Sequence, residues 1–106
     1  MIPAGDRIVS VLGQEVRIEH VPNLLVGDER CEGGCYISER LIKISDEHRE
    51  DEVRYNRILV HEMVHMILGI SGVSEMMTLP IEEAVCVVME SAGVSFDTGD
   101  KIGWHV

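Results

Sequence analysis

The chain has 106 residues, of which 45% are hydrophobic, and its formal net charge at pH 7 is -10. This length fits a single domain with a core of its own, and the apolar fraction argues against a disordered chain. The acidic charge disfavours nucleic acid and anionic membranes as partners, because both would repel the protein at long range, and it favours a basic peptide or protein surface.

The first 45 residues contain segments typical of strands. We predict two hairpins, the first from residues 7–12 and 15–21 and the second from residues 35–37 and 41–44. The tight turn of the first hairpin is expected at Gly13-Gln14, and residues 27–34 between the hairpins read as an exposed loop. Ile42 and Ile44 alternate with polar residues, so they are expected on the buried face of the second hairpin.

Two helices are expected in the second half of the chain. The acidic run over residues 46–52 suits a helix N-terminus, where negative charge is favourable. We predict the first helix over about residues 49–68, ended by Gly69 in the left-handed cap conformation. The second half of this helix is apolar almost all round, which predicts a central position. Pro80 fits the first turn of a second helix, over about residues 81–92.

The first predicted helix contains His61-Glu62-Met63-Val64-His65, an HExxH motif within an apolar run. On a helix, His61 and His65 lie one turn apart on the same face, so both imidazoles can bind one metal ion. Glu62 lies beside them, where it can hold a metal-bound water. Burying three such groups is costly unless each finds a partner, and a bound cation satisfies all three. The motif therefore predicts the core of a zinc hydrolase site; core histidines satisfied by hydrogen bonds are the alternative.

A catalytic zinc ion needs three protein ligands and one open position, so a third ligand must come from elsewhere. The second helix offers Glu82 and Glu83. Glu82 is expected to face inward because it shares a helix face with Val85, Cys86 and Met89. Glu83 shares a face with Glu90 and is expected to meet water. We favour Glu82, keep Glu83 as the alternative, and interpret Cys86 as a small buried hydrophobe.

The remaining histidines are poorer ligand candidates, since they lie in segments without a fixed geometry relative to the motif: His20, His48 and His105. The three cysteines are an odd number, and the Cys31–Cys35 spacing is not that of a zinc knuckle. We expect reduced thiols in a cytoplasmic protein, with a Cys31–Cys35 redox pair as the alternative. Residues 1–6 show no signal-peptide pattern, and the apolar run around the motif is too short to span a bilayer.

The order of these features resembles a known family. The features that carry this resemblance are a strand pair, a Gly-Gly-Cys loop, the strand Leu41-Ile42-Lys43-Ile44, an Arg shortly before HEMVH and a helix opening with Glu82-Glu83. The chain is similar to the small phage- and prophage-encoded zinc metallopeptidases of the gluzincin group, near the ImmA/IrrE-type peptidase domain. The resemblance covers about residues 7–92, and HEMVH is its specific element. It implies that His61 and His65 bind zinc, that Glu62 is the catalytic base, and that one Glu of the pair is the third ligand.

We therefore expect a single metallopeptidase-like domain over residues 1–106 with a minimal zincin-like α+β fold. In it, a small, mostly antiparallel sheet packs on the HExxH helix, and the second helix supplies a Glu ligand. The expected function is hydrolysis of peptide bonds in a peptide or protein substrate, with one Zn²⁺ per chain held by His61, His65 and Glu82 and with Glu62 as general base. The alternative is a zinc-binding interaction protein of phage or prophage origin without catalysis. Neither nucleic acid nor a membrane is expected as partner.

Two further requirements of peptide hydrolysis have candidates in the sequence. The oxyanion of the tetrahedral state needs a donor besides the metal, and four side chains can donate: Tyr36, Tyr55, Arg54 and Arg57. An edge strand within residues 35–44 can hold a peptide substrate by main-chain pairing.

Overall fold

The computed structural model describes residues 6–48 and 50–92. The elements follow one another as β1 (Arg7–Val11), β2 (Gln14–Val21), β3 (Leu25–Val26), β4 (Glu29–Arg30), β5 (Gly33–Tyr36), β6 (Leu41–Ser45), the 3-10 helix η1 (Asp46–His48), α1 (Glu52–Ile70), the 3-10 helix η2 (Val73–Met76) and α2 (Leu79–Ser91). The predicted class is confirmed: this is a small α+β fold with a mostly antiparallel sheet and two α-helices.

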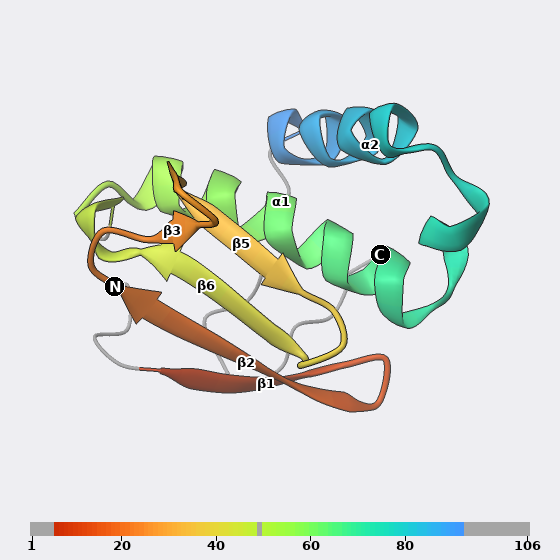
Figure 1. Ribbon diagram of the computed structural model, residues 1–106, viewed down its shortest axis with the longest axis horizontal. Coiled ribbons are helices and arrows are strands. Elements are labelled where there is room, and N and C mark those ends of the chain that lie inside the picture. The colour runs from red at the N-terminus through yellow and green to blue at the C-terminus, as the bar shows by residue number, and fades with distance from the viewer. Residues whose placement is uncertain (1–5, 49, 93–106) are drawn as a thin grey trace.

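Four strands form the main sheet in the order β1-β2-β6-β5 (Figure 1). β1 pairs antiparallel with β2, and β5 pairs antiparallel with β6, so both predicted hairpins are present. β2 and β6 run parallel, with Ile18 opposite Ile42, which requires a long connection between them. β3 and β4 form a separate two-stranded sheet within that connection. In the described part of the chain, β5 is therefore an edge strand.

One face of the sheet packs against α1. Alternation places the apolar side chains of the strands on this face, and they are almost fully buried: Val9, Val11, Val16, Ile18, Ile42 and Ile44. The helix contributes Tyr55, Ile58, Leu59, Val60, Met63, Val64 and Met66. The predicted burial of Ile42 and Ile44 is confirmed, and α1 has the central position expected from its apolar second half.

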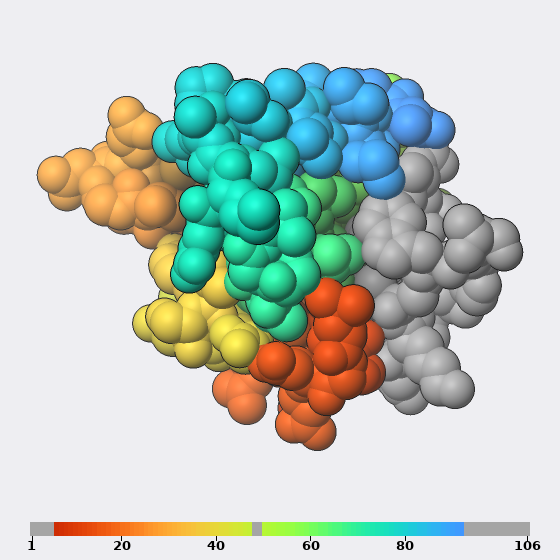
Figure 2. Space-filling view, turned by 90° about the vertical axis from the view of Figure 1, so that its right-hand side faces the viewer, coloured from red at the N-terminus to blue at the C-terminus, as the bar shows by residue number. Residues whose placement is uncertain are grey.

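α2 packs on α1 (Figure 1). It begins two residues before the predicted start at residue 81, and Pro80 lies in its first turn as expected. Figure 2 shows the end of the molecule where the chain passes through η2, in cyan, into α2, with the β1–β2 turn below. No helix of residues 6–48 and 50–92 is long and apolar enough to cross a bilayer.

The turn of the first hairpin is displaced by one residue from the prediction. Leu12 and Gly13, rather than Gly13-Gln14, occupy its two central positions, with φ of 51° and 78°. Two positive φ angles define the type I′ turn, whose twist matches that of the flanking strands. This requirement of the strand twist overrides the poor fit of Leu12 to a left-handed conformation.

The N-terminus of α1 agrees with the prediction, but the predicted cap at Gly69 is wrong. Asp51 caps the helix by accepting a hydrogen bond from the Arg54 N–H at 3.1 Å. The helix continues through Gly69 to Ile70. A Cβ at Gly69 would lie 2.6 Å from Cδ1 of Ile37, so this glycine allows close packing rather than ending the helix.

The predicted loop over residues 27–34 is also partly wrong. It contains β4 and the first half of β5. Gly33 and Gly34 are poor strand formers, yet a Cβ at Gly33 would lie 2.8 Å from Cγ2 of Ile58 and 3.0 Å from Cγ of Glu62. The approach of α1 to this edge strand therefore requires glycine, and it brings β5 against the HExxH motif.

Candidate metal centre

His61 and His65 lie on the same face of α1, as the one-turn spacing predicts, with their ring centroids 5.1 Å apart. Their side chains are 21% and 16% exposed. α2 passes over this face and brings Glu82, Glu83 and Cys86 to the two imidazoles. The HExxH helix and the second helix therefore meet at the predicted site residues.

Glu83 reaches both histidines. One of its carboxylate oxygens lies 2.7 Å from Nε2 of His65, and the other lies 3.3 Å from Nε2 of His61. Glu82 lies 3.5 Å from Nδ1 of His65, and Glu90 lies 3.5 Å from Nδ1 of His61. Each imidazole is thus placed between two carboxylates, of which Glu83 is common to both.

The exposure of the two adjacent glutamates agrees with the predicted helix faces. The side chain of Glu82 is 14% exposed and that of Glu83 is 47% exposed. Although Glu83 is partly exposed, its long side chain still contacts both imidazoles. Both glutamates contact the histidine pair, so the choice of Glu82 as third ligand stays a prediction.

Cys86 is the residue that the sequence analysis did not assign to the site. It is fully buried, as predicted, but its Sγ forms a group with one nitrogen each of His61 and His65 in which all ligand atoms lie within 4.8 Å of one another. These three residues can therefore hold a metal ion. The sequence feature that could have assigned Cys86 to the site is its position one helical turn after Glu82, on the helix face predicted to turn inward.

The surroundings of Cys86 keep its thiol protonated while no cation is bound. Burial raises the pKa of Cys86 to about 12, and the nearby carboxylates of Glu83 and Glu82 add to the effect. A metal ion held by Cys86 must therefore displace a proton, which makes binding through sulfur weaker at low pH.

Glu62 lies between the histidines and the edge strand. Burial raises the pKa of its carboxyl group, an effect that the imidazoles of His61 and His65 partly oppose. A Cβ at Gly33 would lie 3.1 Å from Oε2 of Glu62, so the absence of a side chain at Gly33 makes room for this carboxylate. A raised pKa makes Glu62 a stronger proton acceptor than an exposed glutamate.

A pocket of about 320 Å³ opens over the motif, and its lining comes from α1, α2 and the segment at β5: Glu32, Gly33, Ile58, His61, Glu62 and Glu90. Of the four predicted oxyanion donors, none is in this lining. The Tyr55 hydroxyl is instead buried in a 2.6 Å contact with Nε2 of His20, and the Lys43 ammonium lies over the ring of Tyr36.

Cys31 and Cys35, the alternative redox pair, are not joined by a disulfide bond. All three cysteines are free thiols. Burial raises the pKa of Cys35 to about 12, and the negative charge of Glu62 contributes. Because thiol exchange requires the thiolate, this disfavours Cys35 as a redox nucleophile at neutral pH. His105 lies outside the described residues.

Comparisons of this chain with protein-family models, with curated proteins and with solved structures found no match. The arguments for function therefore come from the chemistry of the site. Two imidazoles, a thiol and carboxylates are the nitrogen, sulfur and oxygen donors that zinc prefers in proteins, and the site fits this ion by donor type.

Proposed function

We propose that this protein is a zinc-dependent metallopeptidase that binds one Zn²⁺ per chain and hydrolyses peptide bonds in a peptide or protein substrate. The observation that carries the proposal is the convergence of two histidines and α2 donors on a pocket that also contains the buried carboxylate of Glu62. A site that only holds a metal has no need of a base beside its first histidine. The free thiols suit the reducing cytoplasm.

The same features support a minimal zincin-like domain of the gluzincin group, near the ImmA/IrrE-type peptidases of phages and prophages. In this reading His61 and His65 hold the metal, and α2 supplies a carboxylate ligand from Glu82 or Glu83. Glu90 lies against Nδ1 of His61, as Glu82 lies against Nδ1 of His65, whereas Glu83 lies against Nε2 of both. A carboxylate at the second ring nitrogen fixes the tautomer and orientation of a metal-binding imidazole.

The bound ion would supply a Lewis acid for the substrate carbonyl and would lower the pKa of a water molecule. Glu62 accepts the proton that this water loses as its oxygen attacks the carbonyl carbon. Glu62 then donates the same proton to the nitrogen of the breaking amide bond, so the carboxylate returns to its starting state. The edge strand β5 is placed to pair with the main chain of an extended substrate beside Glu62.

The test of this mechanism is the substitution Glu62→Gln. The amide keeps the size of the side chain but cannot accept the proton, so peptide hydrolysis should fall by about two to four orders of magnitude. Zinc content, measured by elemental analysis, should be unchanged because Glu62 is not a ligand. Glu75→Gln, at an exposed position of η2, is the matched control and should hydrolyse like the wild type. Hydrolysis that survives in Glu62→Gln would disprove this role.

Cys86 favours a second candidate function, a zinc-binding interaction protein without catalysis. If Cys86 and a glutamate both bind the ion beside the two histidines, the site has four protein ligands and no open position, which is typical of structural zinc. The observation behind this alternative is the proximity of its Sγ to both imidazoles.

Metal affinities of three single variants distinguish the two functions. If the protein is a peptidase, Glu82→Ala should weaken zinc binding by about 10-fold or more, because the ion loses a ligand. Cys86→Ala should leave the zinc affinity nearly unchanged. Glu83→Ala is the matched comparison: a larger loss there than in Glu82→Ala would make Glu83 the third ligand. A strong loss in Cys86→Ala together with a glutamate variant would favour the closed, non-catalytic site.

A further inference from the structure

A second hollow adjoins the pocket over the HExxH motif. It has a volume of about 430 Å³, and it shares three lining residues with that pocket, Glu32, Ile58 and Glu90. The common walls make the two hollows parts of one groove. This groove runs along α1 from Glu62 toward the N-terminus of the helix, where Asp51 and Arg54 line it.

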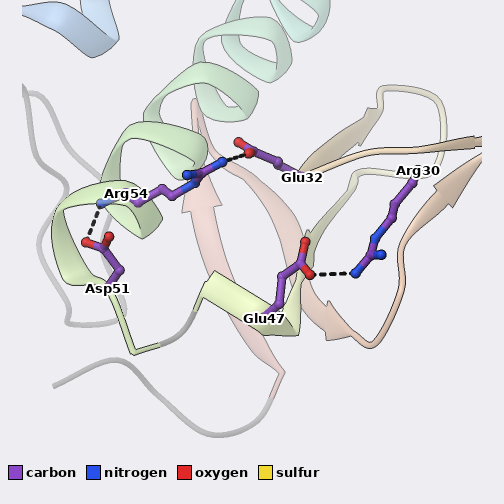
Figure 3. A network of polar contacts seen from close by, with 5 residues as sticks. All are labelled: Arg30, Glu32, Glu47, Asp51 and Arg54. Carbon is purple, nitrogen blue, oxygen red and sulfur yellow. Dashed lines mark hydrogen bonds and ion pairs between the residues drawn. The ribbon is translucent and has the colours of Figure 1, made fainter.

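The acidic groups of the second hollow already have partners. Arg54 forms an ion pair with Glu32, and its backbone N–H donates to Asp51 at 3.1 Å (Figure 3). Glu90 lies against Nδ1 of His61 at 3.5 Å. The carboxylates that line the second hollow are therefore engaged by groups of the protein itself.

Arg57 is the exception among the charged residues of the second hollow. It is exposed, it lines the second hollow, and within the described residues it has no hydrogen bond or ion pair. It precedes His61 by four residues, so it lies one helical turn away on the same face, about 6 Å along the axis. The second hollow is lined by three carboxylates and two guanidinium groups. Arg57 is the one of these five that no group of the described residues engages, and it lies close to the proposed point of hydrolysis.

We propose that Arg57 binds a carboxylate of the substrate, so that the enzyme prefers peptides with an acidic group near the scissile bond. This inference rests on the proposed peptidase function. A guanidinium group matches a carboxylate with two parallel hydrogen bonds, which gives both affinity and orientation. The carboxylate can belong to an acidic side chain or to a free C-terminus, since both present the same group.

The net charge of the chain does not oppose this preference. The charge of -10 acts at long range and is screened beyond about 8 Å at an ionic strength of about 0.15 M. Contact with Arg57 acts within the second hollow, where the carboxylates of Glu32, Asp51 and Glu90 are already engaged. Local pairing therefore decides which peptide binds best, whereas the overall charge affects the rate of encounter.

The test compares kcat/KM for matched peptides that carry Glu or Gln at each position around the cleavage site, each with a free or an amidated C-terminus. The wild type should prefer the carboxylate by about 10-fold or more, as expected for a charge-assisted hydrogen bond. Arg57→Gln should abolish the preference, and Arg57→Lys should keep part of it. Arg17→Gln, which removes an exposed cation from the sheet, should keep all of it. The Glu/Gln pairs and the two forms of the C-terminus show which carboxylate is recognised.

A binding measurement separates failure of this inference from failure of the peptidase proposal. In Glu62→Gln, which is expected not to turn over, the preferred Glu peptide should shift the NMR signal of the Arg57 Nε–H group more than its Gln counterpart does. Hydrolysis without any acidic preference and without this shift would overturn the role of Arg57 alone. The shift without hydrolysis by the wild type would support the groove and overturn the peptidase function.

Discussion

At the scale of single residues, Glu62, the proposed general base, carries a cost to folding. Its carboxyl group is buried beside Gly33 and its pKa is raised by that burial. A raised pKa means that the native state disfavours the ionised form relative to the unfolded chain. In the metal-free protein, the raised pKa of Glu62 therefore lowers the free energy of unfolding at any pH above the pKa of the unfolded chain.

Glu62→Gln should therefore stabilise the metal-free protein. Between the unfolded and folded pKa values, the native state binds more protons at Glu62 than the unfolded state does. The stability of the wild type therefore falls as the pH rises through this window, and the loss persists above it. The advantage of Glu62→Gln should grow over the same window, as measured by urea denaturation with chelator present. Glu75→Gln should show no such growth; an advantage of Glu62→Gln that does not change with pH would contradict the argument.

At the scale of elements, the sequence predicted the features that follow from side-chain periodicity. Alternating Val and Ile gave both hairpins, and Pro80 marked the start of α2. Three features depend on contacts between distant segments and could not be read locally. These are the strand conformation at Gly33, the close packing at Gly69 and the proximity of Cys86 to the histidines. A glycine that accommodates a neighbouring element looks the same in sequence as one that ends a helix.

The packing at Gly69 gives a prediction in which two effects oppose each other. Alanine is a better helix former than glycine by about 1 kcal/mol. A Cβ at this position, however, would lie 2.6 to 2.9 Å from three atoms of Ile37, and overpacking of this kind costs about 1 to 3 kcal/mol. We expect Gly69→Ala to lower the free energy of unfolding in urea denaturation, and Ile37→Ala to remove the effect of Gly69→Ala in a double-mutant cycle. Stabilisation by Gly69→Ala alone would show that Gly69 has no packing role.

At the scale of the whole molecule, the core is large enough that we expect the fold to form without the metal. The sheet and α1 bury a continuous set of aliphatic side chains, and the candidate histidines and glutamates lie where α2 meets α1, beside Cys86 at the edge of this core. The sequence predicted the two histidines and Glu62 because helix geometry fixes their spacing. It could not distinguish Glu82 from Glu83, because both side chains are long enough to reach the imidazoles from adjacent positions of α2.

The central claim is that this arrangement binds a zinc ion, and elemental analysis of the protein purified without an affinity tag or chelator tests it most directly. We expect about one zinc ion per chain in the wild type and a strong loss in His65→Ala, with Arg17→Gln as an unaffected control. A native protein that contains no transition metal, or zinc that remains stoichiometric in His65→Ala, would contradict the claim.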